Sequence, residues 1–397
     1  MSGKRECYRA QMTGPWTYAL ALACYGLAAL GCLYALSAGV LVRRSLSRPD
    51  ARAAQFPGVT ILKPLKGADA GLEADLVSFC DQHYAGPMQV LFGVSDARDA
   101  AVPIVERLIA ARPGRDLALH VTAAISGANP KVANLAGLQA HVCHDIVVLS
   151  DCDIRVAPDY LARVVAALAQ PGVGAVTCLY RGDPRTGVSA TLAAMAIDYH
   201  FLPGVCVGLA LRLARPCFGS TIALRRETLA RIGGIEAFVH ELADDYAIGQ
   251  AVRATGARVA LPRFVVAHAC TERHLADLCN HELRWARTLR AASPLGYAGL
   301  VVTHPLPFAL LGVAFGGLSA ASAWLVVAAI GCRLVLQWQV DHTLGVSSRR
   351  AWLGPARDLL QFAEFVASFF VGVVRWRGHR YKVDGDGTLV PMGEPKA

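Results

Sequence analysis

The sequence predicts an α/β domain that is attached to a membrane by apolar helices on both sides of it. Hydrophobic residues make up 54% of the 397 residues and charged residues only 17%, which is an apolar balance for a soluble protein. Residues 10–42 contain no charged residue, and this stretch is long enough to cross a bilayer. Between residues 58 and 180, short apolar runs alternate with helix-like segments, as in βαβ units around a parallel sheet.

The first apolar stretch predicts a transmembrane helix at residues 16–42. Arg43, Arg44 and Arg48 follow it directly. By the positive-inside rule, this end of the helix lies in the cytoplasm and the N-terminus outside. A cleaved signal peptide is the alternative, but the apolar run is long, begins late and lacks a clear cleavage site.

The α/β pattern begins after a linker at residues 43–57. Strands are expected at 59–65, 88–94, 117–122, 145–149 and 173–179, with helices between them. In parallel sheets of this kind, ligands bind beyond the carboxyl ends of the strands. Asp96 follows the second predicted strand, and Asp151 and Asp153 follow the fourth, so these three carboxylates are expected to converge on one crevice.

The pattern is looser in the second half of the domain. Residues 188–211 are apolar and helix-like and contain His200, which is either a residue of a binding pocket or a lone core or interfacial histidine. A strand at 218–224 and a helix at 225–232 are expected to follow. Asp244 and Asp245 open the next helix. His281, Arg284 and Trp285 have the i, i+3, i+4 spacing that places them on one face of a helix.

The C-terminal part predicts two to three membrane segments. Residues 298–340 are apolar and broken by Pro305 and Pro307, which is enough for two short crossings. Residues 353–374 are interrupted by three charged residues, so their first half is interfacial or re-entrant. The basic tail favours a cytoplasmic C-terminus. The expected parts are a tail at 1–15, a transmembrane helix at 16–42, a linker at 43–57, a cytoplasmic α/β domain at 58–292, membrane segments at 296–376 and a cytoplasmic tail at 377–397.

Charge and cysteine usage narrow the partners and the compartment. The formal net charge is +9, and much of the excess lies beside apolar stretches, which favours anionic lipid or a phosphorylated substrate. No zinc-finger spacing or aromatic–basic signature points to nucleic acid. The 12 cysteines contain no C-x-x-C pair, as expected of reduced thiols in a cytosolic setting. The Ala/Arg/Gly-rich composition suggests a bacterial gene.

Several polar motifs carry possible chemistry. Asp151 and Asp153 form a D-x-D, in which alternate carboxylates can share a divalent cation that holds a diphosphate. Each motif has an ordinary explanation when taken singly: a solvated turn for the D-x-D, helix capping for Asp244 and Asp245, and a surface lysine for Lys131. Their order within one membrane-tethered α/β domain is more specific than any of them alone.

This ordered set resembles the family-2-type glycosyltransferases of GT-A fold, with their D, D-x-D, D and (Q/R)-x-x-R-W motifs. More narrowly, it is similar to the ceramide glucosyltransferase family. Within that family it looks most like the bacterial hopanoid-biosynthesis glycosyltransferases, which add N-acetylglucosamine to bacteriohopanetetrol. The stretches that carry the resemblance are 62–67, 93–96, 129–135, 151–156, 177–182, 243–246 and 281–290. The family's Gln or Arg at the head of the last motif is His281 here.

The resemblance implies a nucleotide-sugar GT-A domain and an inverting, UDP-sugar-dependent hexosyltransferase. Asp245 would be the general base. Asp151 and Asp153 would hold Mg²⁺ or Mn²⁺ and the sugar diphosphate. Donor contacts would come from Asp96, Lys131, Arg284 and His281, and acceptor contacts from Trp285 and His200.

The resemblance also implies the partners and the location. These are a UDP-sugar, a hopanoid or ceramide acceptor and a membrane, with the catalytic domain on the cytoplasmic side of a bacterial inner membrane. The nearest alternative is UDP-glucose transfer to ceramide. A processive polysaccharide synthase and a non-catalytic UDP-sugar-binding protein are less favoured.

Overall fold

The computed structural model describes residues 15–47, 54–122, 127–346 and 351–370, together with the backbone of strands at 373–376, 379–383 and 389–391. The chain forms two units, a helical unit and an α/β unit. The helical unit comprises Met1–Ser47, Asp198–Leu213 and Ser293–Phe370. The α/β unit comprises Arg48–Ile197, Ala214–Ala292 and Val371–Ala397.

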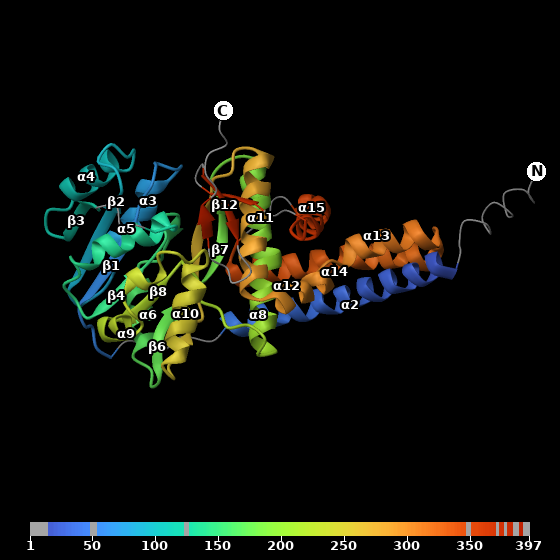
Figure 1. Cartoon of the computed structure of the whole chain (residues 1–397). Coiled ribbons are helices and arrows are strands. Elements are labelled where there is room, and N and C mark those ends of the chain that lie inside the picture. The colour runs from blue at the N-terminus through green and yellow to red at the C-terminus, as the bar shows by residue number, and fades with distance from the viewer. Residues whose placement is uncertain are drawn as a thin grey trace, which may run out of the picture. The chain divides into compact units, whose positions relative to one another are not determined.

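A seven-stranded sheet forms the centre of the α/β unit (Figure 1). Its first three predicted strands are present with nearly the expected bounds, and their alternating helices confirm the α/β class. The strand order is β3 (Asp116–Val121), β2 (Met88–Val94), β1 (Val59–Pro64), β4 (Ile146–Leu149), β8 (Ile222–Arg225), β6 (Val173–Thr177) and β9 (Arg258–Ala260).

One strand of this sheet contradicts the expectation of a purely parallel arrangement. β8 pairs antiparallel with both β4 and β6, whereas the other neighbouring pairs are parallel. The expected strand at 218–224 is also shorter, because Phe218 and Thr221 form an isolated bridge in a turn before β8 begins. Since β8 runs in reverse, its N-terminal end lies beside the carboxyl end of β4.

Helices pack on the sheet through apolar side chains. Leu135 and Leu138 of α5 (Pro130–Gln139) belong to one buried cluster with Leu62 of β1 and Leu91 of β2. Burial of such a side chain contributes roughly 1.5–3 kcal/mol. The other α-helices of the α/β unit before residue 260 are α3 (Leu72–Cys80), α4 (Val102–Ala110), α6 (Tyr160–Leu168), α7 (Val188–Ala196), α9 (Arg226–Arg231) and α10 (Asp244–Ala254).

A second, smaller sheet was not expected from the sequence. It has the order β5 (Ile154–Arg155), β10 (Val265–Cys270), β7 (Leu179–Pro184). β10 pairs antiparallel with β5, directly after the D-x-D, and parallel with β7. The long helix α11 (Leu275–Ala292) follows β10 and contains the predicted helix around residues 281–290.

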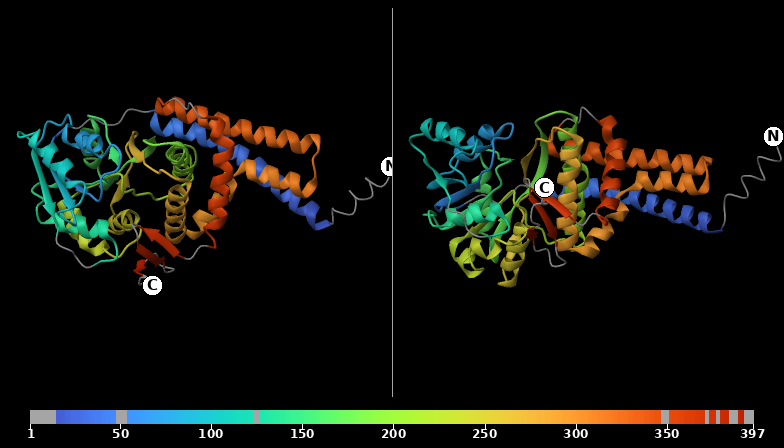
Figure 2. Two further views of the ribbon diagram at one scale, coloured as in Figure 1. Left: turned by 90° about the horizontal axis from the view of Figure 1, so that it is seen from above. Right: turned by 45° about the horizontal axis from the view of Figure 1, so that its top comes forward.

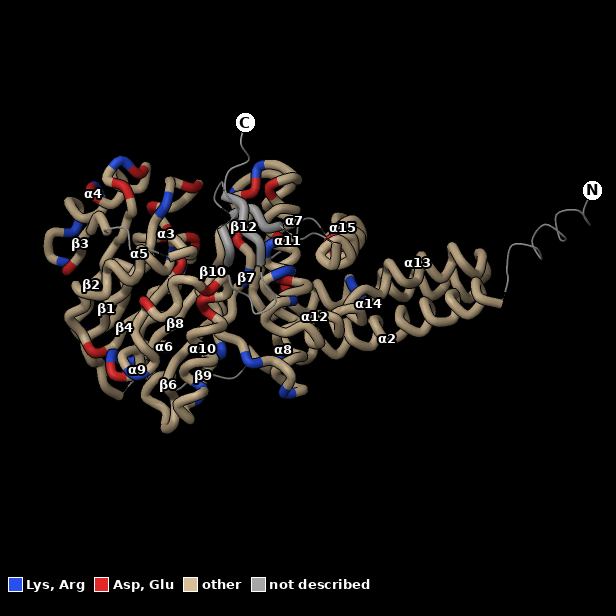
Figure 3. The backbone as a smooth tube through the Cα atoms, in the orientation of Figure 1, with Lys and Arg blue, Asp and Glu red and all other residues tan. Residues whose placement is uncertain are grey.

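The helical unit is built from long apolar helices. α2 (Pro15–Leu46) contacts α13 (Pro305–Gly316) and α14 (Ala320–Leu344) along its length, and the views in Figure 2 keep these three helices side by side. Few Lys, Arg, Asp or Glu residues lie on them (Figure 3). Small residues allow the close approach, since a Cβ atom on Gly312 would lie 2.3 Å from the Tyr25 ring.

Three helical stretches in the described part of the chain are long and apolar enough to cross a membrane, namely Pro15–Leu46, Val188–Ala210 and Ala320–Leu344. The bent pair Pro294–Thr303 and Pro305–Gly316 would make a fourth if it counts as one span. α15 (Gly354–Ala367) has 14 residues, too few for a bilayer at about 1.5 Å per residue. The interrupted segment expected at 353–374 is therefore a short helix.

Two expected boundaries differ from the units. Residues 198–213, expected within the α/β domain, group with the membrane helices, because α8 (Leu202–Ala210) packs on α2. Residues 371–397, expected as the end of the membrane part and a tail, group with the α/β unit and contain the three-stranded sheet of β11 (Val373–Trp376), β12 (His379–Val383) and β13 (Leu389–Pro391). The tail at 1–14 lies outside the described residues.

Candidate active site

The D-x-D loop follows β4 and is fixed from two sides. The backbone N–H of Asp151 donates to the carbonyl of Gly219 at 3.1 Å, and Ser150 Oγ donates to the carbonyl of Ser220 at 2.9 Å. From β1, the buried Lys63 donates to Ser150 Oγ at 3.3 Å and to the carbonyl of Asp151. These hydrogen bonds fix the backbone of the loop and do not use the carboxylate oxygens of Asp151 and Asp153.

Lys131 lies at the start of α5 and joins two carboxylates. Asn129 caps this helix by accepting from the backbone N–H groups of Lys131 and Val132. Lys131 Nζ lies 2.8 Å from Asp151 Oδ1 and 3.0 Å from Asp244 Oδ2. Burial opposes the charge, but Asp151 and Asp244 outweigh it and raise the pKa of Lys131 well above its usual value. Lys131 is therefore a fixed cation.

Asp244 and Asp245 open α10 and face the same group of side chains. Asp244 Oδ1 accepts from Asn129 Nδ2 at 3.2 Å. Asp245 Oδ2 accepts from the backbone N–H of Gly219 at 2.9 Å, and its Oδ1 accepts from the N–H of Tyr246 at 2.8 Å. Burial and the neighbouring Asp244 raise the pKa of Asp245 to about 6, a value suited to a base that works near neutral pH.

Gly219 is the point at which these contacts meet, and sequence reasoning missed it. A Cβ atom there would lie 2.5 Å from Asp151 Oδ2 and 2.9 Å from Lys131 Nζ. Only a glycine lets the turn before β8 approach this closely. The sequence holds no signal for this role, because it depends on the reversed direction of β8.

Asp153 faces a histidine from the second sheet. Its Oδ2 lies 3.4 Å from Nε2 of His268 on β10, and its buried Oδ1 has no hydrogen-bond partner among the described residues. Burial opposes ionisation of Asp153, but His268 and Lys63 outweigh it and lower the pKa of this carboxyl. His268 was not foreseen from the sequence.

This donor set fits a divalent cation. The cluster gathers four carboxylates, those of Asp151, Asp153, Asp244 and Asp245, against the ammonium groups of Lys63 and Lys131. Two carboxylates separated by one residue are ligands that Mg²⁺ and Mn²⁺ prefer, and the His268 imidazole adds a nitrogen. The buried, unpartnered Asp153 Oδ1 is the atom such a cation would satisfy.

The face of α11 brings an aromatic group beside the D-x-D. Trp285 contacts His281 at 4.5 Å and His268 at 5.6 Å between ring centroids, both in edge arrangements. His281 Nδ1 lies 2.7 Å from Oε1 of the half-buried Glu272, a second residue that was not foreseen. Arg284 lies half-buried on the same helix.

Two predicted site residues, Asp96 and His200, make their hydrogen bonds outside the carboxylate cluster. Asp96 is exposed after β2, and its Oδ1 accepts from the N–H of Arg98 in its own turn at 2.8 Å. His200 belongs to the helical unit, where its Nε2 lies 2.8 Å from Arg333 Nη2 and 3.1 Å from Asp358 Oδ1. The other predicted residues, from Lys131 to Trp285, gather in the α/β unit.

Comparison with known proteins places these features in a family. Ceramide glucosyltransferase 1 of Caenorhabditis elegans is 24% identical over 84% of this chain and 73% of its own length. The ceramide glucosyltransferase of Candida albicans is 33% identical over 28% of this chain and 23% of its own length.

Among solved structures, mannosyltransferase PcManGT from Pyrobaculum calidifontis, in complex with GDP-Man and Mn²⁺, matches with a TM-score of 0.53 at 22% identity. The match covers 89% of this chain and 98% of that chain. This likeness shows the fold, a mixed α/β glycosyltransferase fold of the GT-A type. Residues 23–389 match the description of glycosyl transferase family 21, and the chain belongs to that family.

Proposed function

We propose that this chain is a membrane-bound, inverting glycosyltransferase that moves a sugar from a UDP-sugar to a lipid hydroxyl. One observation carries the proposal: the Asp245 carboxylate, with its raised pKa, is held beside Asp151 and Lys131 by the backbone of Gly219. A base next to a group that can hold a diphosphate is what transfer to a hydroxyl requires.

The transfer is a single displacement. Asp245 accepts the proton of the acceptor hydroxyl while that oxygen forms a bond to the anomeric carbon. The bond between this carbon and the diphosphate oxygen breaks, and UDP leaves with the electron pair. A displacement of this kind inverts the anomeric carbon and needs no covalent enzyme intermediate.

The remaining residues take binding roles. Asp151, Asp153 and His268 would hold Mg²⁺ or Mn²⁺, which would supply positive charge for the diphosphate. Lys131 and Arg284 add cationic groups that stabilise the charge that grows on UDP. Asp96, exposed at the end of β2, contacts the uridine or its ribose. Trp285 forms part of the floor of the acceptor site.

For the substrates we propose UDP-N-acetylglucosamine and bacteriohopanetetrol, on the motif resemblance at 177–182 and 281–290. The curated relatives favour a second candidate, because both are ceramide glucosyltransferases; that reaction joins glucose to ceramide. The arginines in the last turn of α2 and the basic C-terminal residues support a cytoplasmic α/β unit at a bacterial inner membrane.

The test uses the full chain reconstituted in lipid nanodiscs. UDP-N-acetylglucosamine and UDP-glucose are each supplied with bacteriohopanetetrol or ceramide, and both UDP release and glycolipid are measured. We expect one donor–acceptor pair to give equal amounts of UDP and glycolipid, EDTA to stop the reaction and Mg²⁺ or Mn²⁺ to restore it. Binding of a UDP-sugar without UDP release for any of the lipids would overturn the proposal, and full activity in EDTA would exclude the metal.

A further inference from the structure

The Glu272–His281 pair sets the chemistry of one imidazole nitrogen. The 2.7 Å contact joins His281 Nδ1 to Oε1 of Glu272, whose side chain is 9% exposed. A carboxylate oxygen only accepts, so Nδ1 carries the proton in this contact. In a neutral ring, Nε2 is then an acceptor. The His281 side chain is 27% exposed. Within the described part of the chain, its ring forms a hydrogen bond through Nδ1 to Glu272.

The surroundings of His281 favour the neutral ring. The charged and titratable groups that face it are Glu272 after β10, His268 on β10, Asp153 after β4 and Arg284 on α11 itself. Burial lowers the pKa of His281, and Arg284 and His268 lower it further against the opposing effect of Glu272. A neutral imidazole presents a lone pair at Nε2, which repels phosphate oxygens and suits the O–H groups of a sugar or an alcohol.

Trp285 makes the neighbouring surface suitable for such a group. Its indole contacts the rings of His281 and His268, and the half-buried ring has an apolar body on which the C–H faces of a sugar or a lipid chain can pack. A molecule that rests on Trp285 would bring its hydroxyl groups within reach of His281.

We infer that His281 Nε2 accepts a hydrogen bond from a hydroxyl group of the substrate that packs on Trp285, with Glu272 as the positioning residue that fixes the ring. The inference rests on the proposed function and assigns His281 to a hydroxyl rather than to the UDP phosphates. The hydroxyl belongs either to the donor sugar or to the lipid acceptor, and kinetics separate the two.

Two substitutions distinguish the two nitrogens. In His281→Gln the amide replaces Nε2, whereas in His281→Asn it replaces Nδ1 and keeps the contact with Glu272. We expect His281→Asn to lower kcat/KM by about tenfold, the loss of one hydrogen bond, and His281→Gln to stay within about threefold of the wild type. A higher KM for the lipid assigns the hydroxyl to the acceptor, and a higher KM for the UDP-sugar assigns it to the donor.

The reverse order would overturn the inference, because a greater loss in His281→Gln means that only the Glu272 contact matters. Unchanged activity in His281→Asn would also overturn it. Thermal unfolding of each variant excludes a folding defect. Nitrogen-15 NMR of labelled histidine, assigned by difference with His281→Asn, tests the tautomer without turnover: we expect a proton on Nδ1, and a proton on Nε2 contradicts the inference. Absence of transfer by the wild type would instead refute the proposed function.

Discussion

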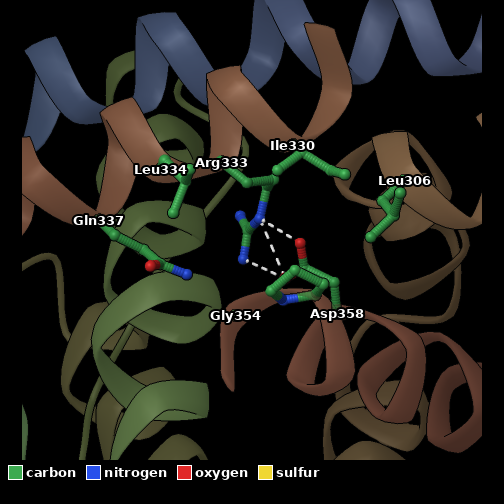
Figure 4. A pocket seen from close by; sticks show the side chains of 8 residues that line it. Leu306, Ile330, Arg333, Leu334, Gln337, Gly354 and Asp358 are labelled. Atoms are coloured by element: carbon green, nitrogen blue, oxygen red, sulfur yellow. Dashed lines mark hydrogen bonds and ion pairs between the residues drawn. The ribbon is translucent and has the colours of Figure 1, made fainter. Parts of the chain in front are cut away.

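The two units each contain a group of buried charges, and the two groups are balanced differently. In the helical unit, Arg333 makes three hydrogen bonds of 2.8–3.1 Å to Asp358 and further contacts to the Tyr199 carbonyl and His200. Figure 4 shows this pair within a small cavity lined by apolar side chains such as Leu306 and Ile330. One cation meets one carboxylate there.

The α/β unit leaves negative charge in excess. Its four clustered carboxylates face two lysine ammonium groups, and the buried Asp153 Oδ1 has no hydrogen-bond partner in the part of the chain that the structure describes. A paired cluster such as Arg333–Asp358 satisfies its own charges inside an apolar unit, where an unpaired charge is costly. A cluster with excess negative charge, by contrast, can bind a cation or another positively charged group from solution. This difference supports the proposal that the α/β cluster, unlike the Arg333–Asp358 pair, is a binding site.

The largest expected effect comes from Asp245→Asn, which removes the proposed base and leaves the other carboxylates in place. Transfer should fall by about 10³-fold, while Mn²⁺ and UDP-sugar still bind in calorimetric titrations. The matched control is Glu241→Gln, the same neutralisation one turn before α10, with activity unchanged. Near-normal turnover by folded Asp245→Asn would mean that the raised pKa of Asp245 serves another purpose.

Gly219→Ala tests whether the close approach in the α/β cluster matters. The new Cβ would lie within 3 Å of Asp151 and Lys131, so one of the two must move. A displacement of about 1 Å can cost about 10²-fold in rate, and we expect a loss of this size in kcat. Gly187→Ala is the control, because a Cβ there meets no atom within 4 Å. Equal activity of the two variants would show that the cluster tolerates displacement.

Arg333→Met tests the balanced cluster. It leaves Asp358 buried without its cation, and the free energy of unfolding should fall by about 3 kcal/mol. The double variant Arg333→Met/Asp358→Leu removes both charges and should recover most of that loss. Denaturant unfolding in detergent measures both. If the double variant loses as much as the single one, the pair contributes more than mutual neutralisation.

The pH dependence gives the smallest effect. The raised pKa of Asp245 means that the folded protein keeps this proton up to about pH 6. The base is therefore lost as the pH falls through 6, and kcat/KM at pH 5 should be about tenfold below its plateau when the metal is limiting. Saturating Mg²⁺ adds positive charge beside Asp245, so the fall in kcat/KM on the acid side should move to lower pH. A flat profile from pH 5 to 7.5 would contradict Asp245 as the titrating base.

The strand ends were readable from the sequence because β1, β2 and β4 are short apolar runs that end in polar residues. Asp151 and Asp153 therefore lie at the expected edge of the sheet. His268 and Glu272 were not foreseen, since they reach Asp153 and His281 through β10 of a second sheet. The role of Gly219 depends on the direction of β8, which no local pattern encodes after the long excursion through 185–217.

Lys63 illustrates a further limit of sequence reasoning. It was part of a quoted motif, yet its fully buried ammonium beneath the D-x-D could not be distinguished from a surface lysine without the sheet. Burial lowers the pKa of Lys63 to about 8.

The most direct test of the account is lipid mass spectrometry of cells that lack this gene and are complemented with wild type or Asp245→Asn. The account predicts that one glycolipid, a hexosaminyl hopanoid or a glucosylceramide, disappears with the gene. It should return with the wild type and stay absent with the variant, although both proteins reach the membrane. An unchanged glycolipid profile without the gene, or full restoration by Asp245→Asn, would contradict it.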